Sequence, residues 1–273
     1  MPGRHSLSED DSAAVIAAAR ACAEAARPQT LRHFRRTALT TENKDGQGFD
    51  PVTEADRAAE LAMRDVLARL RPDDAILGEE YGRSSGSSGL TWVLDPIDGT
   101  RGFISGTPTW GVLIAASDAH GPLFGIIDQP FIGERFEGGL GLARSEGPGG
   151  EIPLGTRPTR TLAEATLFTT FPEVGSEAEA RAFMAVANRA RLTRYGMDCY
   201  AYALLALGQV DLVIEAGLQP YDIHAPIAVV EAAGGLVTDW TGGPAVDGGR
   251  VIAAANPTLH AEALAVLGEA LGD

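Results

Sequence analysis

The stretch 92–103 constrains the fold more than any other part of the chain. It reads Trp-Val-Leu-Asp-Pro-Ile-Asp-Gly-Thr-Arg-Gly-Phe. An apolar run that ends in a carboxylate and continues with proline, a second carboxylate and glycine is typical of a buried strand that breaks into a tight turn and opens a helix. Because Pro96 restricts the turn, Asp95 and Asp98 are held close together. The sequence therefore predicts a cluster of oxygen ligands at the end of a buried strand.

The chemistry of this cluster favours a divalent cation. Two confined carboxylates repel each other, and a cation or a shared proton relieves the repulsion. Hard oxygen ligands match magnesium or manganese rather than zinc. Gly99 and Thr100 add N–H groups and a hydroxyl at a helix start, where a phosphate is favoured. An Asp-Pro turn followed by an ordinary helix cap is the alternative, and this motif alone does not exclude it.

Length and composition indicate a globular protein with mixed secondary structure. With 273 residues, 45% hydrophobic content, 33 glycines and 16 prolines, the chain suits one large domain or two small ones that share a core. Apolar runs stay well below roughly 18 residues, and the amino terminus lacks a signal-peptide pattern. We therefore expect a cytoplasmic protein without a membrane partner. Cys22 and Cys199 match neither a disulfide framework nor a zinc-ligand spacing.

The net charge of −15 argues against a nucleic-acid partner. Neutralising a phosphate backbone requires a block of lysine and arginine, and the densest basic patch, 32–36, is short. An acidic protein that binds an anionic substrate needs local positive charge, which bound divalent ions supply. The charge thus agrees with a metal site near Asp95.

The first residues predict a helix over 8–27, with acidic residues at its start and arginines toward its end, the order that the helix dipole favours. Pro28 is expected to end or kink this helix. A polar segment over 40–48 is expected to form a loop that carries Lys44.

Thr53 and Asp56 form an N-cap signature in front of a helix over 54–70. Asp56 either serves only this cap or also faces a catalytic centre, where it orients the hydroxyl of Thr100. A short strand over 75–77 then leads to Glu79. If this strand neighbours the one that ends at Asp95, Glu79 joins the ligand cluster, since sites of layered sheets gather at strand ends. Otherwise Glu79 belongs to a solvated turn.

Residues 109–136 predict an antiparallel hairpin, and the later part of the chain alternates strands and helices, which suggests a helix-covered sheet. The expected strands are 166–170, 192–195, 210–214, 236–238 and 251–254, and the expected helices are 176–189, 200–207, one from 221 onward, and 258–271. Glycine and proline concentrate over 138–158. We therefore expect an N-terminal α+β subdomain over 1–150 and a C-terminal α/β subdomain over 151–273.

Four segments together resemble the inositol monophosphatase family in order and approximate spacing. They are Asp50-Pro-Val-Thr-Glu-Ala-Asp56, Gly78-Glu-Glu80, Trp92-Val-Leu-Asp-Pro-Ile-Asp-Gly-Thr100, and Tyr221-Asp222 followed by Gly234-Gly235. The resemblance spans almost the whole chain. It implies a layered α-β-α-β-α fold of the sugar-phosphatase type, with metal ions at the junction of an α+β half and an α/β half, and a homodimer.

The resemblance also implies the site residues. The magnesium ligands would be Glu79, Asp95, the carbonyl of Ile97, Asp98 and Asp222, which hold two or three Mg²⁺ ions, with Mn²⁺ as a substitute. Gly99 and Thr100 would bind the phosphate, Glu79 and Thr100 would position the attacking water with the help of Asp56, and Lys44 would approach as a mobile cation. The reaction would be hydrolysis of a phosphate monoester by direct attack of a metal-activated water. Asp222 as a plain helix N-cap is the alternative for that residue.

Residues 194–202 and 215–222 look like those of the histidinol-phosphate phosphatase branch. Asp198 stands where inositol phosphatases have a small residue, and a carboxylate there suits a ligand with cationic groups. Histidinol phosphate carries an ammonium and an imidazole, so Asp198 and Glu215 are expected to accept charge-assisted hydrogen bonds. Arg194 is expected beside them as a substrate-binding residue. A helix N-cap is the alternative for Asp198, and His224 departs from the branch pattern, with a role left open.

Three other functions remain. An inositol-1-phosphatase or a broad sugar-phosphate phosphatase would use the same motifs. A nucleotide phosphatase is disfavoured because the second half has no evident basic pocket for an extra phosphate. A non-catalytic binding or regulatory member of the fold is the remote alternative, disfavoured because every carboxylate needed for metal is present.

Overall fold

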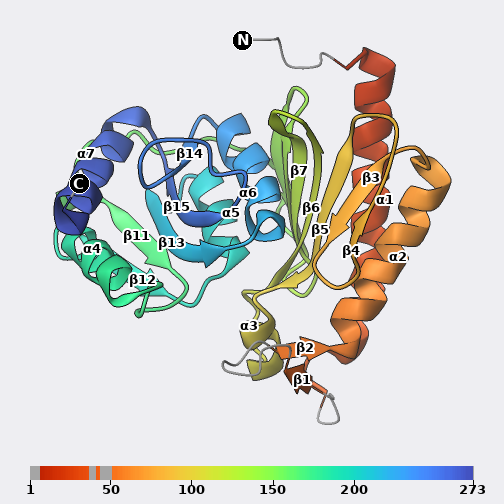
Figure 1. Cartoon of the computed structure of the whole chain (residues 1–273), viewed down its shortest axis with the longest axis horizontal. Helices are drawn as coiled ribbons and strands as arrows, with labels where there is room; N and C mark the ends of the chain where they lie inside the picture. The colour runs from red at the N-terminus through yellow and green to blue at the C-terminus, as the bar shows by residue number, and fades with distance from the viewer. Residues whose placement is uncertain (1–6, 37–40, 44–50, 273) are drawn as a thin grey trace.

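The computed structural model describes residues 7–36, 41–43 and 51–272. Within them, a sheet of eight strands and a sheet of five strands stand side by side. Helices cover the outer face of each sheet and fill the space between them, which gives α-β-α-β-α layers (Figure 1). This arrangement confirms the predicted layered α+β fold.

The eight-stranded sheet is antiparallel apart from one parallel pair, β3–β5. Its order is β10-β9-β8-β7-β6-β5-β3-β4. The strands are β3 (Ala75–Gly78), β4 (Gly82–Ser84), β5 (Thr91–Asp98), β6 (Gly111–Asp118), β7 (Gly121–Gln129), β8 (Glu134–Gly139), β9 (Leu142–Gly147) and β10 (Gly150–Pro153). Helices α1 (Glu9–His33) and α2 (Glu54–Leu70) cover one face, and α5 (Cys199–Ala206) and α6 (Pro220–Ala232) cover the other. The β6–β7 pair confirms the predicted hairpin.

The five-stranded sheet has the order β12-β11-β13-β15-β14, with β12, β11 and β13 parallel. Its strands are β11 (Thr166–Thr169), β12 (Leu192–Tyr195), β13 (Leu212–Leu218), β14 (Leu236–Asp239) and β15 (Gly249–Ala254). The remaining elements are β1 (Thr41–Asn43), β2 (Pro51–Thr53), α3 (Thr100–Ser105), η1 (Leu162–Glu164), α4 (Glu177–Ala187) and α7 (Pro257–Leu271). These elements agree with those predicted from 166 onward, although β13 continues beyond Ile214 to Leu218.

The central strands are buried on both faces. Trp92 and Leu94 of β5 pack with α1 and α2, whereas Val93 between them packs with α5 and α6. Successive side chains of a strand point to opposite faces, so a strand covered on both sides reads as one continuous apolar run. This double coverage explains why the apolar run before Asp95 has no polar alternation.

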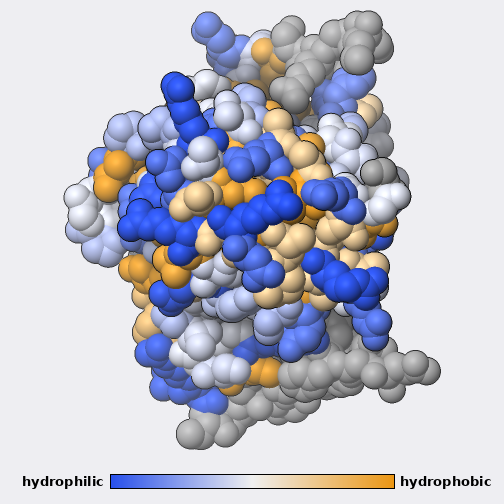
Figure 2. Space-filling model, turned by 90° about the vertical axis from the view of Figure 1, so that its left-hand side faces the viewer, coloured by the Kyte–Doolittle hydropathy of each residue, from blue (hydrophilic) through white to orange (hydrophobic). Residues whose placement is uncertain are grey.

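The outer face over α4 and α7 is mostly hydrophilic, with small hydrophobic areas between the hydrophilic residues (Figure 2). Met184 of α4 and Leu192 of β12 are among the exposed large hydrophobic side chains. Singly exposed apolar side chains of this kind are common on protein surfaces. Among the described residues, none of the helices combines the length and the apolar character that a membrane span requires.

Of the two outcomes predicted for Pro28, an end of the first helix is wrong, because α1 runs on to His33 with Pro28 inside it, and a kink stays a prediction. Pro28 is exposed, and it has no N–H to donate to the carbonyl of Glu24 one turn earlier. Ala26 and Thr30 on either side are fully buried, and their packing holds the helix together across the proline.

The chain passes from the eight-stranded sheet to the five-stranded sheet between residues 153 and 166. The eight-stranded sheet includes β10, which ends at Pro153, and the five-stranded sheet begins with β11 at Thr166. A division after residue 150 would therefore cut the β9–β10 hairpin. Helix α6 packs on the eight-stranded sheet, so both halves share one core, and the two-subdomain division stays a prediction.

Candidate active site

Asp95 and Asp98 lie at the end of β5, on either side of a β-bulge. Asp95 pairs with Leu113 and Asp98 with Gly111, and the register shifts between them. The N–H of Ile97 donates to the Asp95 carboxylate at 3.0 Å. Helix α3 then begins at Thr100, which confirms the predicted sequence of strand, turn and helix.

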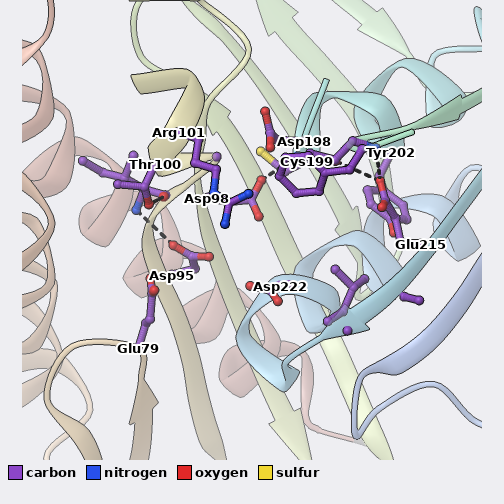
Figure 3. Close-up of a pocket in the computed structure, with 17 residues that line it drawn as sticks. Glu79, Asp95, Asp98, Thr100, Arg101, Asp198, Cys199, Tyr202, Glu215 and Asp222 are labelled. Carbon is purple, nitrogen blue, oxygen red and sulfur yellow. Dashed lines mark hydrogen bonds between the residues drawn. The ribbon is translucent and has the colours of Figure 1, made fainter. Parts of the chain in front are cut away.

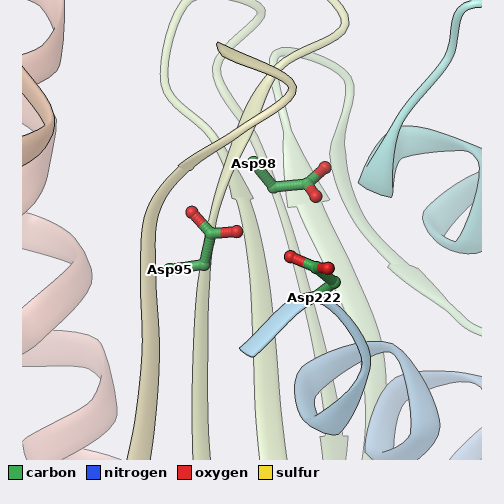
Figure 4. Close-up of side chains that lie close together, drawn as sticks. All are labelled: Asp95, Asp98 and Asp222. Carbon is green, nitrogen blue, oxygen red and sulfur yellow. The ribbon is translucent and has the colours of Figure 1, made fainter. Parts of the chain in front are cut away.

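Asp222 comes from the other half of the chain and completes an acidic triad with Asp95 and Asp98. One carboxylate oxygen of each residue lies within 4.8 Å of the other two. Their carboxyl groups face a common space (Figure 4). Asp222 is not the N-cap of α6, because Gln219 holds that position and its N–H donates to Asp222 at 2.7 Å.

The triad fits a divalent cation. Burial, followed by the charges of Glu79, Asp98 and Asp222, raises the pKa of Asp95 well above its ordinary value. Burial and the charges of Asp198 and Asp222 likewise raise the pKa of Asp98. A set of buried and half-buried, mutually repelling oxygen donors is stabilised by a hard cation such as Mg²⁺. The residues present therefore match the metal site that the sequence predicts.

Glu79 lies next to this triad. Strand β3 pairs in parallel with β5, with Gly78 opposite Leu94, and the N–H of Glu79 donates to the carbonyl of Leu94 at 3.2 Å. The two strands therefore end side by side, which is the placement that the sequence left open. Glu79 shares the pocket with Asp95 (Figure 3), and its charge is the largest of those that raise the pKa of Asp95.

A pocket of about 250 Å³ opens over the triad, between the two halves of the chain. It is bounded by the end of β5, the start of α3, the end of β13 and the starts of α5 and α6. Its lining residues are Glu79, Asp95, Ile97, Asp98, Gly99, Thr100, Arg101, Thr170, Phe171, Asp198, Cys199, Tyr202, Glu215, Ala216, Gly217, Leu218 and Asp222. All predicted metal ligands are among them.

Asp198 lies against the segment that is expected to bind phosphate. A Cβ on Gly99, whose φ is +82°, would lie 2.8 Å from the Asp198 carboxyl carbon, so this close approach requires glycine. Asp198 precedes α5 but makes no side-chain capping bond to it within the described residues. Asp98 accepts the N–H of Cys199 instead, at 2.6 Å. Asp198 thus occupies the N-cap position of α5, as the alternative predicts, but its carboxylate does not cap the helix.

Burial raises the pKa of Asp198 to about 6, although a hydrogen bond from Thr109 and the charge of Arg101 oppose the rise. Burial also raises the pKa of Glu215 to about 7. Glu215 accepts hydrogen bonds from the N–H of Thr170 at 2.7 Å and from its hydroxyl at 2.9 Å. Figure 3 shows both carboxylates on the side of the pocket away from Glu79.

Not every predicted site residue reaches the pocket. Arg194 is exposed on β12, an edge strand, and is absent from the pocket lining among the described residues. Lys44 lies outside the residues that the structure describes. Thr100 lines the pocket, and its hydroxyl donates to the carbonyl of Ile97 at 3.1 Å.

Asp56 is buried in the capping box of α2, where it accepts the N–H of Thr53 at 2.9 Å and its hydroxyl at 2.5 Å. The predicted helix over 54–70 and its cap are thus confirmed. Burial raises the pKa of Asp56 to about 7, and the charges of Glu79 and Glu80 act in the same direction. Its role in orienting Thr100 stays a prediction.

Eight lining residues were not predicted, and three of them, Arg101, Phe171 and Tyr202, bring a charged or aromatic side chain to the pocket. The guanidinium carbon of Arg101 lies 4.8 Å from the ring centroid of Phe171, at the pocket. Tyr202 is buried, and its hydroxyl has no hydrogen-bond partner among the described residues. Arg101 directly follows the Gly-Thr pair, and Tyr202 stands one helical turn after Asp198, so both had a signal in the sequence. Phe171 had none.

His224 serves the packing of α6. Its Nδ1 lies 2.8 Å from the hydroxyl of Ser117 and its Nε2 lies 2.9 Å from the carbonyl of Val246. Burial lowers its pKa, which favours the neutral ring. Both nitrogens thus bind structural partners outside the pocket over the triad.

Comparison with known proteins shows the family to which the chain belongs. The model of the inositol monophosphatase family matches residues 11–271. The bifunctional phosphatase IMPL2, chloroplastic, of Arabidopsis thaliana is 40% identical over 269 residues, which cover 94% of this chain and 76% of that protein. The histidinol-phosphatase of Mycobacterium tuberculosis is 34% identical over 248 residues, with 89% and 95% covered. An inositol monophosphatase structure from Zymomonas mobilis has a TM-score of 0.82 and 39% identity, with 96% and 99% covered.

The layered fold and the acidic pocket between its halves are therefore those of a metal-dependent phosphatase that acts on phosphate monoesters. The chain belongs to the inositol monophosphatase family, as its motifs predict.

Proposed function

We propose that this protein is a Mg²⁺-dependent histidinol-phosphate phosphatase, which hydrolyses L-histidinol phosphate to L-histidinol and phosphate in histidine biosynthesis. The observation that carries the proposal is that Asp198 and Glu215 line the same 250 Å³ pocket as the acidic triad. Burial disfavours the charged forms of both carboxylates, and a cationic ligand would favour them again. The histidinol-phosphatase among the relatives supports the same substrate.

Each end of the substrate then has its own residues. Glu79, Asp95, the carbonyl of Ile97, Asp98 and Asp222 would hold two or three Mg²⁺ ions, or Mn²⁺ in their place. When bound, these ions neutralise the phosphoryl oxygens and acidify water. Gly99 and Thr100 bind the phosphate.

Glu79 and Thr100 hold the attacking water, and Asp56 orients Thr100. Asp198 and Glu215 accept hydrogen bonds from the ammonium and the imidazole of histidinol phosphate. The departing alkoxide takes a proton from water, so this mechanism uses neither of the buried cysteines.

An inositol-1-phosphatase, or a phosphatase with broad preference for sugar phosphates, is the second candidate. The similarity to the inositol monophosphatase from Zymomonas mobilis favours it. Asp198 and Glu215 would then accept hydrogen bonds from neutral hydroxyls, which are weaker than those from a cation.

The deciding experiment is the ratio of kcat/KM for L-histidinol phosphate to that for inositol-1-phosphate at saturating Mg²⁺. We expect a preference of about 100-fold or more for histidinol phosphate, equal to ~2.7 kcal/mol of transition-state discrimination. A ratio near one would overturn the substrate assignment but not the chemistry.

Release of phosphate from an aryl phosphate, with and without EDTA, tests the chemistry itself. Turnover that persists in EDTA would contradict the metal requirement, and absent turnover would favour a non-catalytic member of the fold. A homodimer, a cytoplasmic location and the absence of a nucleic-acid partner stay predictions from the sequence.

A further inference from the structure

Glu60 is a fully buried carboxylate on α2 that binds the main chain next to Glu79. It accepts the N–H of Glu80 at 2.7 Å and the N–H of Tyr81 at 3.2 Å. A carboxylate is buried only where donors compensate the loss of water. Two of its donors are consecutive peptide groups directly after Glu79, so Glu60 fixes the direction in which the chain leaves that residue.

Arg64 extends this contact to the following turn. It lies one helical turn after Glu60, and its Nε donates to the Glu60 carboxylate at 2.7 Å. Its Nη2 donates to the carbonyl of Gly82 at 2.5 Å. The pair therefore ties the segment 79–81 between β3 and β4, and the first residue of β4, to α2.

Gly78 makes room for this contact. A Cβ at this position would lie 2.0 Å from Oε1 of Glu60, a distance at which a side chain and the carboxylate cannot coexist. On the other side of Glu79, its own N–H is held by Leu94 of β5. The main chain is thus fixed on both sides of Glu79. Strand β5 binds the N–H of Glu79 itself, and Glu60 binds the N–H groups of the two residues that follow.

We propose that Glu60 is a positioning residue that aims the Glu79 carboxylate at the metal site, with Arg64 as its support. The inference rests on the proposed role of Glu79 as a metal ligand. Partners that orient a ligand from behind commonly change metal affinity by about 10- to 100-fold when they are removed. A purely stabilising role explains the Glu60–Arg64 ion pair less well, because a protein with well-packed apolar residues in place of a buried ion pair is often at least as stable.

The test is Mn²⁺ binding by the purified protein, measured from the EPR signal of free Mn²⁺ and therefore independent of activity. Glu60→Gln keeps the size of the side chain but turns an NH₂ group toward main-chain N–H groups. We expect Mn²⁺ to bind about 10- to 100-fold more weakly. The Mg²⁺ concentration for half-maximal activity should rise by the same factor.

Asp74→Asn is the matched control. Asp74 is also buried, accepts a bond from Arg71 at 2.7 Å and from the Trp92 indole at 2.8 Å, and lies just before β3, at the end of the strand away from Glu79. Its amide variant should lower Tm while leaving Mn²⁺ affinity within about twofold of the wild type. An equal loss of affinity in both variants would mean that Glu60 acts only through general stability.

The double variant Glu60→Gln/Glu79→Gln tests whether Glu60 affects metal binding through Glu79. If Glu60 acts through Glu79, the double variant binds Mn²⁺ no more weakly than Glu79→Gln alone, whereas independent effects would multiply. Unchanged affinity in Glu60→Gln would overturn the inference, while a wild-type protein that binds no Mn²⁺ would instead overturn the proposed function. If Glu60→Gln does not fold, Arg64→Lys takes its place, with a smaller loss expected in the same direction.

Discussion

Replacement of Asp198 by asparagine isolates the charge that is proposed to recognise the substrate. Asparagine has the same shape as aspartate, so the backbone at this position, with a φ of 47°, accommodates either residue equally. The carboxylate makes no capping bond to α5 within the described part of the chain, so the helix start does not depend on it. The change therefore removes a negative charge from the pocket and leaves the helix start intact.

The size of the effect follows from the surroundings of Asp198. Two unit charges ~4 Å apart attract by about 4 kcal/mol at the effective dielectric of a protein surface. Arg101 already favours the ionised form of Asp198, so the carboxylate is partly neutralised before the substrate binds. We therefore expect the value of a charged hydrogen bond, about 1.5–3 kcal/mol. This corresponds to a loss of about 10- to 150-fold in kcat/KM for L-histidinol phosphate.

The assay compares L-histidinol phosphate with inositol-1-phosphate for the wild type and Asp198→Asn at saturating Mg²⁺. Saturation matters because the charge of Asp198 also raises the pKa of Asp98 in the triad. Hydrolysis of inositol-1-phosphate should change less than about threefold, since its uncharged polyol part offers no cation to the carboxylate. Equal losses for the two substrates would refute charge recognition and assign Asp198 to the support of Asp98.

Four further outcomes are expected. Asp95→Asn should abolish turnover without lowering Tm, because it removes a repelling charge, and activity within tenfold of wild type would contradict the metal assignment. Mg²⁺ at about 100 times its Kd should raise Tm, since it adds ~2.7 kcal/mol of stability, and EDTA should reverse the shift. Tyr202→Phe removes a buried hydroxyl that has no partner among the described residues, so it should leave Tm unchanged. Tyr200→Phe removes a 2.7 Å hydrogen bond to the carboxylate of Glu134, so it should lower Tm by a few degrees. Arg250 and the cap of α4 lower the pKa of Glu179 from 4.5 to about 2. In urea unfolding, Glu179→Gln should therefore lower the free energy of unfolding by its full amount at pH 7, and the difference from the wild type should shrink as the pH falls from about 4.5 to 2.

The segment around Asp95 was predictable because its information is local. The apolar run, Pro96 and Gly99 specify a strand, a bulged turn and a helix start within a few residues, and the structure has all three. Asp56 was equally visible, since its capping box with Thr53 depends only on neighbours in the sequence. Local geometry of this kind is set by side chains three or four residues apart.

The position of Glu79 could not be derived in the same way, because it depends on strand order. Its proximity to Asp95 comes from the parallel pairing of β3 with β5, and nothing within 75–79 specifies a partner strand. Arg194 is the reverse case, a residue that lies near Asp198 in the sequence but not in the structure. It stands four residues before Asp198, but β12 ends at Tyr195 and Gly196, at a φ of +78°, turns the chain, so the two side chains part.

Two groups of carboxylates in one pocket are distinguished by what surrounds them rather than by residue type. Glu215 accepts bonds from Thr169 and Thr170, and Asp198 lies in the field of Arg101, so donors already compensate part of their charge. Asp95 accepts one N–H, from Ile97, and otherwise faces carboxylates whose charges raise its pKa. Uncompensated repulsion of this kind favours a small, highly charged ion, whereas partly compensated carboxylates suit an organic cation. The same acidic composition can therefore serve both a metal site and the proposed recognition of a cationic substrate within one pocket.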